Sequence, residues 1–64
     1  MGWRWTGPPE KRKPRAARGG HRSEIEAKRD AVKAATGKLV ADDGLVEQLF
    51  SGMHRDGWRV EIEL

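Results

Sequence analysis

The stretch 58-WRVEIEL-64 alternates apolar and charged side chains over its whole length. A period of two, with aromatic and β-branched residues on one side, is typical of a strand that buries one face. Asp56 and Gly57, just before it, supply a turn or a helix stop. A lone strand leaves its backbone groups and its apolar face without partners. We therefore expect this strand to pair with another segment through the side of the strand formed by Trp58, Val60, Ile62 and Leu64.

Three partners are open to the strand: Trp3-Arg4-Trp5, Lys38-Leu39-Val40, or a sheet edge of another molecule. Alternation places both indoles of the first segment on one side, and we favour this partner because the strand at the far end of the chain has the matching pattern. Trp3 and Trp5 would then share a face with Trp58 and Ile62, above Leu45, Leu49 and Phe50 of a helix. In the competing interpretation the two indoles stack on unpaired bases or enter a pocket of a partner.

Two helices are expected between these segments. Ser23 and Glu26 have the spacing of a capping box, and Gly37 stands where a left-handed cap belongs, which predicts a helix over residues 24–36. Asp42 or Asp43 can cap a second helix. Its apolar residues recur at helical spacing and form a continuous stripe of Leu45, Val46, Leu49, Phe50 and Met53. Such a stripe usually belongs to the core.

Charge is divided unevenly along the chain. The whole sequence of 64 residues has a net charge of +3, but residues 1–22 hold seven Lys/Arg and one acidic residue, a net +6. Residues 23–64 hold six basic and nine acidic residues, a net −3. The first part also contains three prolines and has no large apolar side chain between Thr6 and Arg22. We predict a basic Pro/Gly-rich arm over residues 1–22, disordered alone, and a small helix-helix-strand body over residues 23–64.

An arm of this kind can bind a polyanion by placing cations beside phosphates and releasing condensed counterions. Its candidate phosphate contacts are Arg4, Lys11, Arg12, Lys13, Arg15, Arg18 and Arg22. Two other interpretations stay open. The charges can serve as a solvated tail, or the arm can lie along an acidic surface of another protein.

Short matches to catalytic and metal-binding motifs are present, but each lacks the other residues or the spacing that the motif needs. His54-Arg55-Asp56 matches a kinase triplet, but the other kinase motifs have no counterpart here. Thr36-Gly37-Lys38 lacks the first glycine and the magnesium-binding hydroxyl of a phosphate loop. His21 and His54 are far apart in sequence, with no third ligand at suitable spacing. We predict a protein that is not an enzyme and that has no metal and no cofactor.

The chain has no cysteine, and its longest apolar run is Leu39-Val40-Ala41. That run is far short of the roughly 20 residues that span a bilayer. We therefore expect a cytoplasmic protein with no membrane contact.

Together these patterns predict an α+β fold: a basic extended N-terminal arm, two short helices, and a C-terminal strand paired with the N-terminal segment or with a partner chain. The expected function is nucleic-acid association, DNA or RNA, with the arm on phosphate and the body used for attachment or for a homodimer. The alternative is a small accessory subunit or inhibitor that docks on a larger protein or assembly by strand addition and Trp anchors. The residues expected to pair with a partner or strand are Trp3, Trp5, Trp58, Val60, Ile62 and Leu64.

Overall fold

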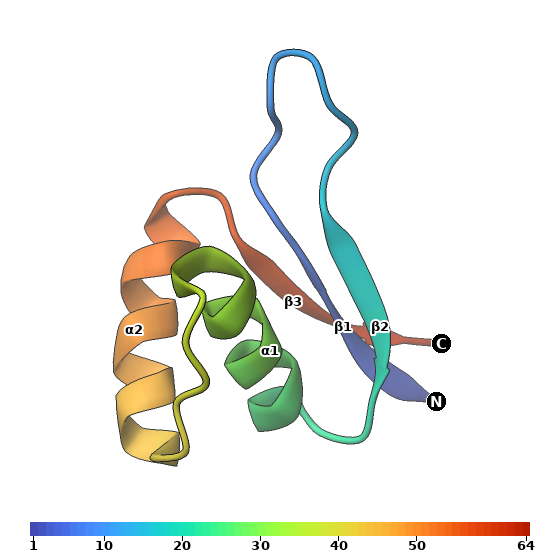
Figure 1. Ribbon diagram of the computed structural model, residues 1–64. Coiled ribbons are helices and arrows are strands. Elements are labelled where there is room, and N and C mark those ends of the chain that lie inside the picture. The colour runs from blue at the N-terminus through green and yellow to red at the C-terminus, as the bar shows by residue number, and fades with distance from the viewer.

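Three strands and two helices make up the computed structural model, which describes all 64 residues. Their order is β1 (Gly2–Thr6), β2 (Ala17–His21), α1 (Glu24–Thr36), α2 (Asp43–Arg55) and β3 (Arg59–Glu63). The strands form one antiparallel sheet in the order β2-β1-β3, so the first strand of the chain is the central one (Figure 1). The predicted α+β class is confirmed.

Helix α1 begins and ends where its capping residues predict. The hydroxyl of Ser23 accepts a hydrogen bond from the backbone N–H of Glu26 at 3.3 Å. The Glu26 carboxylate accepts one from the N–H of Arg22 at 3.0 Å, one residue earlier than in a standard capping box. At the other end Gly37 has a φ of 78°, which glycine adopts without a steric penalty, and its N–H donates to the carbonyl of Lys33. The predicted helix over residues 24–36 is confirmed.

Helix α2 buries a narrower side than its apolar stripe predicts. Asp42 is its N-cap, since its carboxylate accepts a hydrogen bond from the N–H of Leu45 at 3.1 Å. Val46 is fully buried and Phe50 is 6% exposed, but Leu45 and Leu49 remain 44% and 37% exposed. The expectation that these two leucines lie beneath the tryptophans is wrong. The physical reason is that α2 packs mainly on α1 and touches the strands sparsely, so one side of its stripe has nothing to cover it.

The N-terminal segment folds back on the C-terminal strand, as predicted. In the register of β1 and β3, Trp3 lies opposite Ile62 and Trp5 lies opposite Val60. Burial is less complete than expected, because Ile62 is 49% exposed and Leu64 is fully exposed. β3 is an edge strand with a neighbouring strand on one side only, and this explains the exposure.

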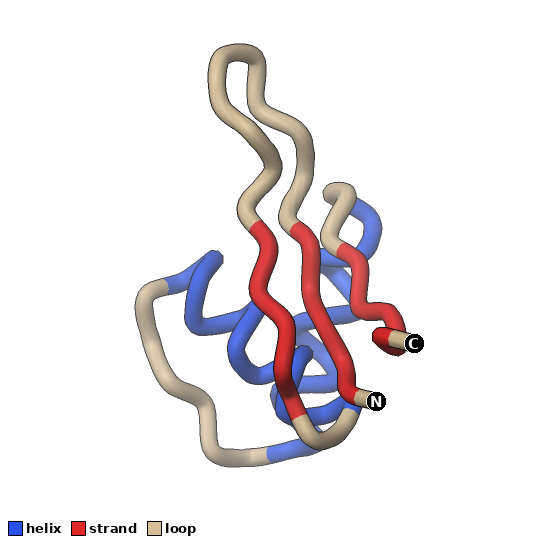
Figure 2. Tube along the Cα trace, turned by 90° about the vertical axis from the view of Figure 1, so that its right-hand side faces the viewer, coloured by secondary structure: helices blue, strands red, loops and turns tan.

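The helices cover one face of the sheet and leave the other open (Figure 2). Helix α1 lies against all three strands, and α2 packs on α1. The core joins the layers: Trp5, Ala31 and Phe50 are buried together, with Met53, Trp58 and Val60 packed at the margin. The rings of Trp5 and Trp58 lie 5.5 Å apart between centroids. Small alanines on α1 allow this close approach to the sheet.

Residues 1–22 contribute two of the three strands. β2 has the sequence Ala-Arg-Gly-Gly-His, in which no apolar alternation predicts a strand. It forms because β1 offers a row of backbone donors and acceptors, with Trp5 opposite Arg18 and Thr6 opposite Ala17. In the structure this part of the chain is therefore a hairpin of the sheet. Its behaviour as an isolated arm, separate from a body that begins at residue 23, stays a prediction.

Candidate nucleic-acid interface

A loop over residues 7–16 connects β1 to β2 and projects beyond the sheet (Figure 1). We call this loop the finger. At its base the N–H of Gly7 donates to the carbonyl of Ala16 at 2.7 Å, which extends the hairpin ladder. Near its tip Glu10 pairs with Lys13 in an isolated antiparallel bridge, with the turn between them. The two arms of the finger are thus joined at its base and again near its tip.

The base of the finger rests on the turn that leads into β3. Gly7 is buried, and a Cβ at this position would lie 3.6 Å from the ring of Trp58. Gly57, with a φ of 110°, lies so close to Pro8 that a Cβ would come within 3.1 Å of the proline Cβ. These contacts set the direction in which the finger leaves the sheet.

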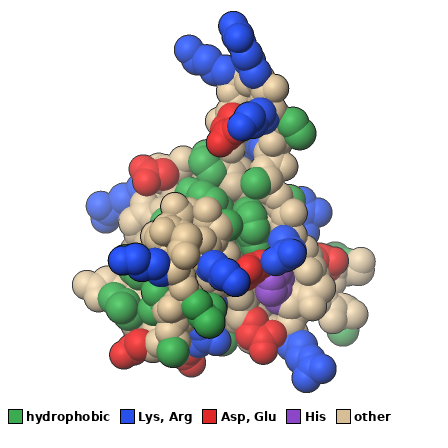
Figure 3. Space-filling view, viewed as in Figure 1, with side chains coloured by type: hydrophobic (Ala, Val, Ile, Leu, Met, Phe, Trp, Pro, Cys, Tyr) green, Lys and Arg blue, Asp and Glu red, His purple; other side chains and the backbone are tan.

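The cations of the finger are free of acidic partners. Lys11, Arg12, Lys13 and Arg15 are all exposed, and none forms an ion pair. Glu10 is the single acidic residue of the finger. Lys and Arg side chains stand out at the outer end of the projection in Figure 3. Their charges are therefore not neutralised within the molecule.

In the strand part of the hairpin, charged and polar side chains of β1 and β2 contact Asp30 of α1. Its Oδ2 accepts hydrogen bonds from Trp5 Nε1 at 2.8 Å and from His21 Nε2 at 3.0 Å. Its Oδ1 lies 3.7 Å from Nη1 of Arg18. Partial burial alone would raise the pKa of Asp30, but the hydrogen bonds from Trp5 and His21 and the charge of Arg18 hold that pKa below its ordinary value. We call these four residues the Asp30 cluster.

His21 connects two strands to the helix. Its Nδ1 lies 3.1 Å from the carbonyl oxygen of Trp3, while Nε2 faces the Asp30 carboxylate. Both partners are acceptors, so the ring makes both hydrogen bonds at once only when both nitrogens carry a hydrogen. The Asp30 cluster therefore joins β1, β2 and α1 through charge-assisted bonds.

The structure divides the seven cations predicted to contact phosphate. Four are gathered on the finger. Arg4 lies on the uncovered face of the sheet, opposite Glu61, and donates a hydrogen bond to the hydroxyl of Thr6 at 3.5 Å. Arg18 is paired with Asp30, and Arg22 is exposed just beyond β2. Arg18 thus has a partner inside the fold, and Arg4 and Arg22 lie apart from the finger.

The residues predicted to pair with a partner or strand also divide. Trp5 is 6% exposed, and Trp3, Trp58 and Val60 are half-buried inside the fold. Ile62 and Leu64 remain exposed at the end of β3. The aromatic members thus serve the fold of the free chain, and the exposed members lie on the edge strand.

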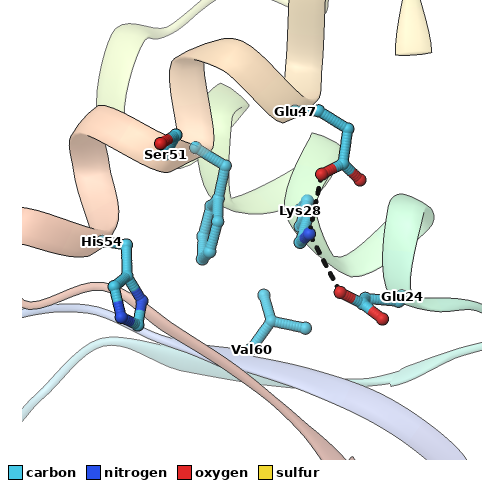
Figure 4. A pocket seen from close by; sticks show the side chains of 7 residues that line it. Glu24, Lys28, Glu47, Ser51, His54 and Val60 are labelled. Carbon is cyan, nitrogen blue, oxygen red and sulfur yellow. Dashed lines mark hydrogen bonds and ion pairs between the residues drawn. The ribbon is translucent and has the colours of Figure 1, made fainter. Parts of the chain in front are cut away.

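A groove of about 390 Å³ lies between the two helices and Val60 of β3 (Figure 4). Lys28 stands in it, with Nζ 2.9 Å from carboxylate oxygens of both Glu24 and Glu47. Burial lowers the pKa of Lys28, but the two carboxylates outweigh that effect and raise it above its ordinary value. The groove therefore holds an ion-pair network that links the helices. No group of three or more His, Cys, Asp or Glu side chains comes together as a metal site.

Sequence patterns pointed to His21 only as a weak metal candidate and missed Asp30 altogether. One signal was present. Asp30 stands beside Ala31 and three residues after Ala27, both buried, so its side chain starts near the covered side of α1. A carboxylate that is partly buried there needs hydrogen-bond donors, and the sequence offers them in the tryptophans and His21.

No protein-family model, curated protein or solved structure matches the chain. Neither helix has the length and apolar character needed to cross a membrane.

Proposed function

We propose that the protein binds nucleic acid through the finger, with the sheet and helices acting as its support. One observation carries the proposal: the finger presents Lys11, Arg12, Lys13 and Arg15 on a projection where no acidic side chain pairs with them. Elsewhere, Arg18, Lys28 and Arg29 are neutralised by carboxylates. Unpaired cations gain most from phosphate, because no internal ion pair has to be broken first.

The shape of the finger suits the same target. The finger is narrow enough to enter the major groove of a DNA duplex, where the cations of its turn and second arm can reach phosphates of the flanking strands. Such contacts give affinity and position without reading the base sequence. We propose a binding role of this kind, with no catalytic step, for DNA or RNA.

A rival function is docking on a larger protein by strand addition. The free edge of β3 and the exposed Ile62 favour it. Against it stands the use of the tryptophans inside the fold, which leaves few aromatic anchors for a partner. The two functions differ in their response to salt. Phosphate binding weakens steeply with ionic strength, while an apolar strand interface changes little.

The test compares two triple variants that remove the same charges. One is Lys11→Gln/Arg12→Gln/Lys13→Gln in the finger, and its matched control is Lys33→Gln/Lys38→Gln/Arg55→Gln in the helical layer. All six cations are exposed and unpaired. Fluorescence anisotropy with a labelled duplex of mixed sequence, and with its single strand, gives the affinity over a range of salt concentrations.

We expect the finger variant to bind at least about tenfold more weakly than the control. The slope of log K against log salt should also fall by roughly 0.9 for each duplex phosphate that the variant no longer neutralises. Equally weakened binding in the two variants would indicate general attraction to a basic protein. Salt-independent binding, or none, would contradict the proposed function.

A further inference from the structure

The two edges of the sheet differ in how well they are protected from pairing. β2 has a bulge opposite the Trp3–Trp5 segment and contains Gly20 with a φ of 83°. Such an irregular edge is a poor template for another strand. β3 pairs with β1 without any register shift, and it contains no proline and no lysine. Its outer side has no neighbour in the sheet (Figure 2). β3 is therefore the edge that is ready to accept a strand.

On β3 an apolar side chain is exposed on one face, and charged side chains without an ion pair lie on the other. On the helix side Ile62 is 49% exposed, although the same face of β1 is covered. On the open side Glu61 forms no hydrogen bond or ion pair with its cross-strand neighbour Arg4. Arg59 donates through Nη1 to the carbonyls of His54 and Trp58 and forms no ion pair. A strand that fits this edge should supply an apolar neighbour for Ile62 and opposite charges for Arg59 and Glu61.

We propose that this strand is β3 of a second copy of the chain, paired antiparallel about a two-fold axis at Val60. In this register Arg59 of each copy faces Glu61 of the other, so two opposite-charge pairs form across the interface. Val60 faces its own counterpart on the helix side. Trp58 faces Ile62 of the other copy, which covers the exposed part of that side chain.

Neighbouring registers fail on charge. An axis at Arg59 places the two arginines opposite each other, and an axis at Glu61 does the same with the two glutamates. An axis at Ile62 sets Glu61 against Glu63 of the other copy. Like charges directly opposite one another destabilise a strand pair. Of these four registers, the axis at Val60 is the one that sets opposite charges directly across from each other and no like charges.

The resulting dimer has a six-stranded sheet with all four helices on one face, because the two-fold axis of an antiparallel pair is perpendicular to the sheet. The two fingers then leave opposite ends of that sheet. This inference does not depend on nucleic-acid binding, and its test uses the protein alone.

The test is sedimentation equilibrium of the full chain from micromolar to sub-millimolar concentration. We expect the unmodified chain to dimerise. Arg59→Glu and Glu61→Arg each place two like-charge pairs at the interface, so each alone should dimerise at least about tenfold more weakly. Mixed together, the two variants should form a heterodimer, because one then presents only acidic side chains at positions 59 and 61 and the other presents only basic ones. Both variants retain a net positive charge, so bulk attraction cannot produce that result.

Glu10→Arg is the matched control, since it makes a charge change of the same size on the finger and should dimerise like the unmodified chain. Circular dichroism of each variant separates impaired pairing from impaired folding. A chain that stays monomeric throughout the range overturns the proposal. It is also overturned if the two single variants dimerise as well as the unmodified chain, or if their mixture stays monomeric while both are folded.

Single-cysteine variants test the register, because the chain has no cysteine of its own. Residues directly opposite in an antiparallel pair have Cα atoms about 4.5–5.5 Å apart, within reach of a disulfide. Val60→Cys should therefore form a crosslinked dimer on mild oxidation much faster than Glu61→Cys. Faster crosslinking through position 61 would move the axis to Glu61 and overturn the proposed register.

Discussion

Basic side chains lie both on the strands of the β1–β2 hairpin and on its finger, but their surroundings differ. In the Asp30 cluster, Arg18 and His21 lie beside Asp30, and the carboxylate also accepts a hydrogen bond from the indole N–H of Trp5. At the tip, the cations of the finger have no acidic partner. The Asp30 cluster therefore contributes to the stability of the fold, and the charges of the finger remain available to a ligand. Whether a cation of the hairpin stabilises the fold or stays free for a ligand depends on whether an acidic side chain lies beside it.

Two cations of the helical layer are paired in the same way as Arg18. Lys28 is held between Glu24 and Glu47, and Arg29 pairs with Asp43 while its Nε donates to the carbonyl of Val40 at 3.0 Å. These contacts join α1 to α2 and to the loop between them. Substitutions in the Asp30 cluster should therefore lower the stability of the chain, and substitutions on the finger should leave it unchanged.

Trp5→Ala should have the largest effect on stability. Trp5 is 6% exposed, packs against Trp58 and donates to Asp30, so its removal leaves a cavity and an unsatisfied carboxylate. Truncation of a buried tryptophan costs roughly 3–5 kcal/mol, about all that a domain of this size has. We expect the variant to be largely unfolded at room temperature, as measured by circular dichroism. The triple finger variant is the control and should melt like the unmodified chain. If the Trp5→Ala chain stays folded, Trp5 and the Asp30 cluster are not essential to the stability of the fold.

Asp30→Asn should have an intermediate effect. The substitution keeps the volume of the side chain but removes the charge that His21 and Arg18 face, which costs on the order of 1–3 kcal/mol in the free energy of unfolding. Urea denaturation measures this change at neutral pH. Glu10→Gln, the same kind of substitution on the finger, is the control and should leave the urea midpoint unchanged.

The pH dependence of the free energy of unfolding gives a second test of Asp30→Asn. Because the folded-state pKa of Asp30 is lowered from its ordinary value of 3.8, the unfolded chain binds the proton more tightly than the folded one. The stabilisation is therefore complete above that ordinary value and is lost as the pH falls through the folded-state pKa. We expect Asp30→Asn to flatten the acid limb of the stability profile. An unchanged acid limb would show that the cluster does not stabilise the fold.

Gly52→Ala should have the smallest effect, and in the opposite direction. Gly52 lies inside α2, and a Cβ built on it meets no atom within 4 Å. Alanine at this position should stabilise the helix by roughly 0.5–1 kcal/mol, which raises the melting temperature by a few degrees. Duplex affinity should not change, because the finger is untouched. A change in affinity would mean that the helical layer takes part in binding.

Local signals predicted the helices well. Ser23 and Gly37 cap the two ends of α1, and Asp42 caps the start of α2. These positions were predictable because helix capping depends on a few neighbouring residues. The strand in 58-WRVEIEL-64 was also predictable, since alternation is a local pattern. The core residues of α2 were predicted less well: the stripe includes Leu45 and Leu49, whose exposure depends on which element α2 packs against.

Strand β2 and the Asp30 cluster could not be predicted in the same way. Residues 17–21 have no strand pattern, and they adopt one because β1 presents a complementary backbone. His21 and Asp30 are nine residues apart, and Trp5 is 25 residues from Asp30, so no short motif connects them.

By itself, the amino-acid sequence determined the local choices of this protein: helix boundaries, the turn at Gly57, the alternation of the last strand, and the excess of cations near the N-terminus. The tertiary structure alone decided which strand lies in the centre of the sheet, that residues 1–22 form a hairpin, and which cations meet a carboxylate. The physical reason is one of range. Capping and alternation depend on neighbours in the chain, while pairing and neutralisation depend on groups that only folding brings together.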